Sequence, residues 1–181
     1  NEVVQIRNYL FHPNGFNVEA LGRDAVWIAR ECGIRVPKKT RILVTPINSI
    51  GIEEPLAREK LCPVLSFYVA NSPKQAIAQS RATLRATVAG HSAVIHSQNE
   101  RMILDFASRV ECYRVVVNAS CSLGASGFNT NLAPSFTIGT GFYGRSSLGE
   151  NLGPQHLIHW TQIAYNSDPS VAFGKFNELS L

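Results

Sequence analysis

The sequence predicts an α/β fold in which a parallel sheet is flanked by helices. Between about residues 24 and 118, short β-rich runs alternate with amphipathic stretches of helical period. Strands joined by helices form right-handed βαβ units, and the parallel sheet that results is covered on both faces. The chain has 181 residues, of which 45% are hydrophobic and 17% charged, and this composition suits one globular domain with its own core.

Three helices are expected from apolar spacing and from capping residues. The first covers Arg23–Glu31 at the periphery of the fold and is followed by Gly33, a common helix terminator. The second begins at Ser72-Pro73, because serine caps helices and proline is tolerated in their first turn. The third is capped by Asn99. Its apolar face comprises Met102, Ile103, Phe106, Ala107 and Val110.

The expected strands are short runs rich in β-branched and apolar residues, at positions 41–45, 64–69, 92–95 and 113–117. After Asn118 the chain becomes rich in Gly, Ser and Asn up to about residue 154. Residues 157–165 then alternate in period two, which indicates an exposed or pairing strand. We therefore expect one unit over residues 1–165 and a loose tail over residues 166–181.

Composition and charge exclude several classes of protein. The formal net charge of +4 comes from scattered Lys and Arg without interleaved aromatic residues, so no nucleic-acid partner is expected. No apolar run is long enough to cross a membrane, and no signal-peptide pattern opens the chain. The four cysteines are far apart and form no CxxC pair, which indicates reduced thiols and a cytoplasmic location.

Two motifs suggest chemistry but have simpler explanations. Gly139–Gly144 reads G-x-G-x-x-G, yet no amphipathic helix follows it to bind a pyrophosphate, so we interpret it as a flexible loop. A nucleotide-binding domain that uses this loop remains the weakest of the alternatives. His156 and His159 lie in a strand-like segment without a third ligand nearby, so no metal is expected.

Three residues stand where a functional group would be useful. Cys121 lies in a polar loop after a strand, where open α/β sheets form their sites, and is a candidate to line a pocket. His91 follows Gly90 at a loop–strand junction and is a candidate general acid or base, or a surface histidine. Glu59 precedes Pro63 at the start of a strand and either points at a ligand or caps the preceding turn.

Taken together, these stretches resemble the C-terminal part of the aldehyde dehydrogenase superfamily, and most of all its CoA-acylating acetaldehyde dehydrogenase branch. The resemblance covers roughly residues 18–165 in order and spacing. It rests on the stretches VP (36–37), TRIL (40–43), EPLAREKLCPVL (54–65), GHSAVI (90–95), VN (117–118), LAPSFTIG (132–139) and ENLGPQHLI (150–158).

The resemblance implies a fold of the aldehyde dehydrogenase catalytic-domain type with a C-terminal pairing strand at 157–165. It implies the reaction of an aldehyde with CoA and NAD to give acyl-CoA and NADH. Glu59 would bind the nicotinamide ribose, Leu61 would pack beside it, and His91 would assist the thiol chemistry. Asn118, Ser120 and Cys121 would line the acyl pocket. Asn118 and Ser120 are named here on the resemblance alone.

The nucleophilic cysteine of that branch has no matching position here, because none of the four cysteines lies in the matching context. We therefore expect the cysteine and the cofactor domain to precede Asn1, so that this chain alone would be inactive. A small aldehyde and CoA, a homo-oligomer, and a cytoplasmic location, within a bacterial microcompartment in some branches, are further implications. The alternative is a non-catalytic assembly module that pairs with homologous subunits.

Overall fold

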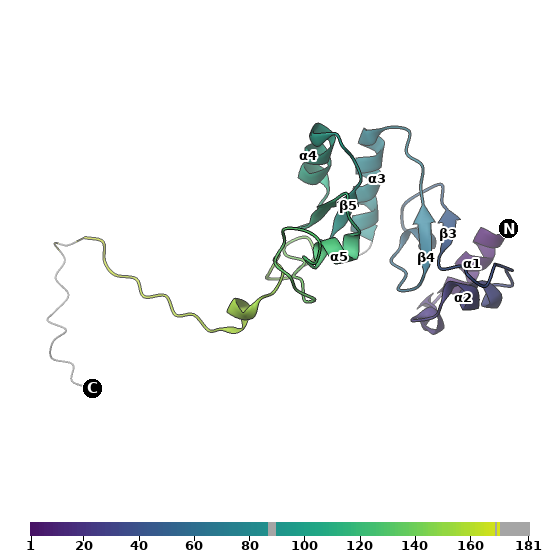
Figure 1. The fold of residues 1–181 in the computed structure, drawn as a ribbon, viewed down its shortest axis with the longest axis horizontal. Coiled ribbons are helices and arrows are strands. Elements are labelled where there is room, and N and C mark those ends of the chain that lie inside the picture. Colours follow the sequence, from purple (N-terminus) through teal and green to yellow (C-terminus); the bar gives the residue numbers. More distant parts are fainter. Residues whose placement is uncertain (87–89, 169, 171–181) are drawn as a thin grey trace.

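The computed structural model describes residues 1–86, 90–168 and 170, and its elements form two groups, each around its own hydrophobic cluster. Figure 1 shows α1, α2, β3 and β4 in one group and α3, α4, β5 and α5 in the other, with the segment after residue 157 leading away from both. The α/β class is confirmed, since helices accompany parallel strand pairs in both groups.

The first group holds the larger core. Its elements are α1 (Glu2–Leu10), β1 (Phe11–His12), β2 (Gly15–Phe16), the 3₁₀ turn η1 (Val18–Ala20), α2 (Ala25–Glu31), β3 (Leu43–Pro46), the 3₁₀ turn η2 (Pro55–Ala57) and β4 (Val64–Phe67).

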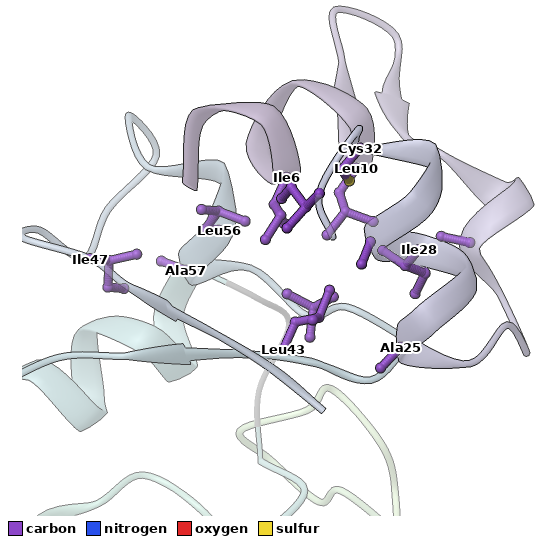
Figure 2. Packing of buried hydrophobic residues seen from close by; sticks show 13 residues of the cluster. Ile6, Leu10, Ala25, Ile28, Cys32, Leu43, Ile47, Leu56 and Ala57 are labelled. Carbon is purple, nitrogen blue, oxygen red and sulfur yellow. The ribbon is translucent and has the colours of Figure 1, made fainter. Parts of the chain in front are cut away.

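Side chains of α1 and α2 meet those of β3 and η2 in this core. Leu10, Ile28 and Leu56 are fully buried, and Figure 2 shows them with Ile6 and Leu43 pointing into a shared interior. Burying such a side chain contributes about 1.5–3 kcal/mol relative to leaving it exposed. The expectation that α2 is peripheral is therefore wrong: its apolar face is part of the main core of the group.

The second group comprises α3 (Pro73–Ala86), β5 (Ala93–Ile95), α4 (Glu100–Arg109), β6 (Val115–Val117), α5 (Cys121–Ala125) and the 3₁₀ turn η3 (Pro154–Leu157). Its cluster is smaller and is built on Ile77 of α3 and Phe106 and Val110 of α4. Both predicted caps are confirmed, since Ser72 Oγ accepts from the Gln75 N–H at 3.2 Å and Asn99 Oδ1 accepts from the Met102 N–H at 3.2 Å.

The strands pair in parallel as predicted, but they form separate pairs. β3 pairs with β4 and β5 pairs with β6, while β1 and β2 form a short antiparallel hairpin that the sequence had not indicated. Helix α1 was also not predicted. The carboxyl ends of β5 and β6 lie at one edge, because their register joins Ala93 to Val115 and Ile95 to Val117.

The strand expected over residues 157–165 does not form within the described chain. Residues 158–168 have no regular secondary structure, and every residue from 157 to 168 is exposed. A β-strand requires a neighbouring strand to satisfy its ladder, and none of the described strands runs beside this segment. In the described part of the chain, no helix combines the length and apolar character that crossing a membrane requires.

Candidate functional site

Glu59 and Leu61 lie on the outer side of the turn that precedes β4. Leu61 is 65% exposed, and Glu59 is exposed and makes no hydrogen bond or ion pair with the described residues. The residue between them points the opposite way: Lys60 Nζ donates to the carbonyls of Leu56 at 2.5 Å and Arg58 at 2.9 Å. Burial lowers the pKa of the Lys60 ammonium. The turn therefore presents a free carboxylate on an anchored backbone.

Capping of the preceding turn, the alternative role for Glu59, is performed by another residue. Glu54 Oε1 accepts from the Leu56 N–H at 3.0 Å at the start of η2. Beyond Glu59, the Cys62 N–H donates to the Lys60 carbonyl and the Val64 N–H to the Cys62 carbonyl, both at 2.7 Å. These tight turns lead directly into β4. None of the hydrogen bonds named here involves the Glu59 carboxylate.

His91 lies at the amino-terminal approach to β5. Its imidazole is exposed, and Nδ1 lies 2.9 Å from Ser92 Oγ. The residue before it is held by a close backbone approach: Gly90 has φ +102°, and a Cβ there would lie 2.5 Å from the Thr140 carbonyl oxygen. Only glycine fits both constraints. The histidine is therefore attached to a firmly placed backbone while its ring remains accessible.

A buried arginine holds this region together. Arg114, only 3% exposed, donates from Nε to Asn151 Oδ1 at 2.6 Å and from Nη2 to the Gly149 carbonyl at 2.9 Å. Its Nη1 donates to the carbonyls of Gly139 at 2.8 Å and His91 at 3.2 Å. Burial lowers the pKa of the guanidinium. Asn151 in turn donates to two further loop carbonyls, those of Ala125 and Ala133.

The glycine loop at 139–144 packs against Tyr113. A Cβ on Gly141 would lie 2.3 Å from Tyr113 Cζ, and one on Gly149 would lie 2.4 Å from its ring. The Phe142 N–H donates to the Tyr113 hydroxyl at 3.1 Å. The loop opens no helix in the described chain, in agreement with its interpretation as a non-dinucleotide motif. Gly139 and Gly141 allow close packing, which the sequence had not indicated for this loop.

The acyl-pocket candidates follow β6. Asn118 has φ +53°, and its amide is engaged with Ser97: Oδ1 accepts from the Ser97 N–H at 2.9 Å and Nδ2 donates to the Ser97 carbonyl at 2.8 Å. Ser120 is exposed at the start of α5 and makes no capping hydrogen bond. Cys121 is half-buried, and burial raises the pKa of its thiol, which suits a lining residue better than a nucleophile.

His91 and Asn118 lie at opposite ends of the β5–β6 pair. The Gly90 carbonyl accepts from the Tyr113 N–H at one end, and the Asn118 N–H donates to the Ile95 carbonyl at the other. The five steps along the chain from His91 to His96, the residue after Ile95, correspond to about 16 Å of extended backbone. The structure thus groups His91 with Arg114, and groups Asn118, Ser120 and Cys121 with each other.

Sequence reasoning missed Arg114 and gave Asn151 no role. The available signal was Arg114 itself, a charged residue directly before the apolar run Val115–Val117, because a buried charge needs partners. His156 of the His156/His159 pair is also engaged locally, since its Nδ1 accepts from the Gly153 N–H at 2.9 Å. The described residues contain no group of three or more potential metal ligands close together.

The sequence and the fold of the chain are both similar to those of known aldehyde dehydrogenases. The chain is 38% identical over 178 residues to an aldehyde-alcohol dehydrogenase of Clostridium acetobutylicum. The aligned part covers 96% of this chain and 21% of that protein. It also matches the crystal structure of an acetylating aldehyde dehydrogenase from Geobacillus thermoglucosidasius, with a TM-score of 0.87 and 27% identity over 96% of this chain and 38% of the other. A third match is a probable aldehyde dehydrogenase from Listeria monocytogenes, with a TM-score of 0.85 and 36% identity over 91% of this chain and 36% of the other.

The resemblance to the acylating aldehyde dehydrogenases is thereby confirmed, in sequence and in fold. No family model matches the chain. The chain spans between 21% and 38% of the length of these three proteins, so the greater part of each has no counterpart in it.

Proposed function

We propose that this chain is part of the catalytic domain of an NAD-dependent, CoA-acylating aldehyde dehydrogenase. The observation that supports the proposal most strongly is the match along 96% of the chain to an acetylating aldehyde dehydrogenase structure. In the proposed reaction an aldehyde, CoA and NAD give acyl-CoA and NADH. The reactive cysteine would come from a segment outside this chain. Cys32 is buried, the other three cysteines are half-buried, and burial raises the pKa of each thiol.

In this proposal His91 handles protons. An imidazole titrates near neutral pH and can take a proton from a thiol that attacks a carbonyl, then return it to the departing group. The exposed ring, attached to a backbone fixed at Gly90, provides the access and the rigidity that such a role requires. The hydrogen bond between Nδ1 and Ser92 Oγ leaves Nε2 as the nitrogen available to a substrate.

The turn before β4 fits a nicotinamide cofactor. NAD supplies the acceptor for the hydride that leaves the substrate carbon. Glu59 is a free carboxylate that can accept hydrogen bonds from two ribose hydroxyls, and exposed Leu61 offers an apolar surface beside it. The anchoring of Lys60 fixes the direction of both side chains.

Ser120 and Cys121 follow β6 at the opposite edge, so we propose that they line the far part of the acyl pocket, away from the carbonyl group that His91 serves. Their small side chains suit a short acyl group, and the acetyl group is the default. The amide of Asn118 contributes by holding the Ser97 loop, since both of its polar atoms are already bonded there. The parent protein is proposed to be cytoplasmic or microcompartment-associated and to form a homo-oligomer.

The decisive experiment measures NADH formation from acetaldehyde by the full-length protein, with and without CoA. The proposal predicts that NADH formation depends on CoA and that acyl-CoA accumulates in equal amount. His91→Ala is expected to lower kcat about 100-fold, in the range that general acid–base groups contribute. His12→Ala, at another exposed histidine, serves as the matched control and should leave kcat unchanged. NADH formation that is equally fast without CoA would exclude the acylating activity.

A second candidate function is that of a non-catalytic assembly module. The observation that favours it is the segment after η3, where Leu157, Trp160, Ile163 and Tyr165 are between 73% and 86% exposed and contact no described strand. Pairing with a homologous subunit would cover them. Light scattering of the purified chain, together with the activity assay, decides this point. A dimer or larger assembly that Ile163→Asp dissociates, in a protein without CoA-dependent activity, supports the module, whereas a monomer argues against it.

A further inference from the structure

We infer that Arg114 is a positioning residue for His91, and this inference rests on the proposed function. Arg114 contacts no position assigned to substrate or cofactor. It acts through the backbone, because its guanidinium links the carbonyl of His91 to the carbonyls of Gly139 and Gly149. The histidine and the folded glycine loop are thereby held in one arrangement.

The two residues that precede β6 approach the His91 junction with three bonds. The Tyr113 N–H donates to the Gly90 carbonyl at 3.3 Å, Arg114 Nη1 donates to the His91 carbonyl at 3.2 Å, and the Arg114 carbonyl accepts from the Ala93 N–H at 2.8 Å. Two of these are ordinary ladder contacts. The two backbone bonds flank the junction that precedes β5, and the bond from the Arg114 side chain holds the residue between them, His91.

The opposite side of the junction is supported by the glycine loop. Gly90 packs against the Thr140 carbonyl and the Gly144 N–H so closely that no Cβ could be accommodated. Arg114 holds the start of this loop at Gly139 and the segment that follows it at Gly149, through separate nitrogens. A change at Arg114 would therefore release the His91 backbone and the loop that presses on it at the same time.

The chemistry of the site calls for arginine. A guanidinium carries five N–H donors in a planar fork, and here four neutral acceptors surround it: three carbonyl oxygens and the Asn151 amide oxygen. None of the ion pairs among residues 1–86, 90–168 and 170 includes Arg114. A lysine would keep the charge, yet its single nitrogen cannot reach acceptors spread around a plane.

The test compares Arg114→Lys with wild type in the full-length protein, with Arg109→Lys as the control. Arg109 is an exposed arginine on α4 whose one ion pair with the described residues is to Asp105. Because a displacement of about 1 Å can cost 100-fold in rate, we expect Arg114→Lys to lower kcat roughly 10- to 100-fold with KM for aldehyde and NAD within about threefold. The acidic limb of the pH profile of kcat should also shift, since the imidazole would have new surroundings.

A purely structural role predicts otherwise. In that case Arg114→Lys lowers the Tm but leaves kcat per folded molecule and its pH profile unchanged, and this result would overturn the inference. A wild-type protein without CoA-dependent activity would instead refute the proposed function, so the two failures are distinguishable.

If Arg114→Lys does not fold, a matched pair at Asn151 decides the question. Asn151→Ala and Asn151→Asp both remove the donors to Ala125 and Ala133, but the aspartate keeps an acceptor for Arg114 Nε. The inference predicts a kcat at least about fivefold higher for Asn151→Asp than for Asn151→Ala, because only the aspartate orients the guanidinium. Equal kcat values in the two variants would contradict it.

Discussion

Arg7 and Glu54 form a two-point ion pair that fastens α1 to η2. Arg7 Nε donates to Glu54 Oε1 at 3.0 Å and Nη2 donates to Oε2 at 2.6 Å, and the carboxylate side chain is only 10% exposed. The same carboxylate caps η2 through the Leu56 N–H. One buried acid therefore connects the first helix with the segment that leads to Glu59.

Arg7→Met should destabilise the protein by about 2 kcal/mol, because a buried carboxylate loses its charged donors. Burial by itself would raise the pKa of Glu54, but the bonds from Arg7 and the Leu56 N–H outweigh it and lower the pKa. This stabilisation is therefore present above the pKa of the unfolded chain and is lost as pH falls through the folded value. Urea unfolding at pH 7 and at pH 3 should show a smaller acid-induced loss in Arg7→Met than in wild type. Arg101→Met, at an exposed arginine on α4, should change neither value.

The glycine at position 141 should be required because of Tyr113. Gly141→Ala combines a left-handed backbone, φ +55°, with a collision against the Tyr113 ring, and should cost about 3 kcal/mol. Gly22→Ala, at φ +70° with no atom within 4 Å of the added Cβ, isolates the backbone strain and should cost about 1 kcal/mol. Thermal unfolding of both variants provides the comparison.

A double-mutant cycle identifies the source of that cost. In a Tyr113→Ala background the ring is absent, so Gly141→Ala should cost no more than Gly22→Ala does. An undiminished cost would show that the ring is not the obstacle and that another part of the loop requires the glycine.

The elements that sequence predicted best are those whose signals are local. Asn99 caps α4 and the apolar face of α2 is buried, because capping and helical spacing depend only on neighbouring residues. Segment 157–165 shows the limit of a local signal. Its alternation indicates a strand that pairs with another subunit, and a strand needs such a partner to form its ladder, so the described chain by itself does not test this prediction.

The site was predictable only in part for a similar reason. The resemblance selected Glu59 and His91, and the structure leaves both side chains exposed. The role of Arg114 depends on carbonyls from segments far apart in the sequence, at His91, Gly139 and Gly149, which converge only in the folded chain. No spacing rule reports such a convergence.

Glu111 should make stability depend on acid at a second site. Arg85 donates to it from Nε at 2.9 Å and from Nη2 at 2.6 Å, and Arg81 donates as well. These hydrogen bonds, with that from Arg85 the largest cause, lower the pKa of Glu111 to about 2. Since the carboxyl of an unfolded glutamate titrates near about 4.3, the pair stabilises the fold above that pH and loses its effect as pH falls toward about 2.

Unfolding between pH 5 and pH 2 should therefore be less pH-dependent in Glu111→Gln than in wild type. Because the ion pairs of Glu111 with Arg81 and Arg85 are partly exposed, about 1 M NaCl should weaken them. The difference in pH dependence between Glu111→Gln and wild type should then become smaller. Identical pH dependence in low salt would mean that the two arginines do not hold Glu111 in solution. Glu100→Gln, at an exposed glutamate at the start of α4, is the control.

Lys60→Met should weaken cofactor binding although it leaves Glu59 and Leu61, the residues proposed to contact the cofactor, unchanged. Loss of the bonds from Nζ to the Leu56 and Arg58 carbonyls frees the turn that orients Glu59 and Leu61. We expect the KM for NAD to rise roughly tenfold, equivalent to about 1.4 kcal/mol, with a smaller change in kcat. Glu59→Gln should raise the same KM, and the double variant should be less than additive because both changes act on one contact. Steady-state kinetics of the full-length protein test this, with Lys74→Met at an exposed lysine of α3 as control. A KM for NAD that stays at the wild-type value in both Lys60→Met and Glu59→Gln would remove Glu59 from the cofactor site, whatever the effect on Tm.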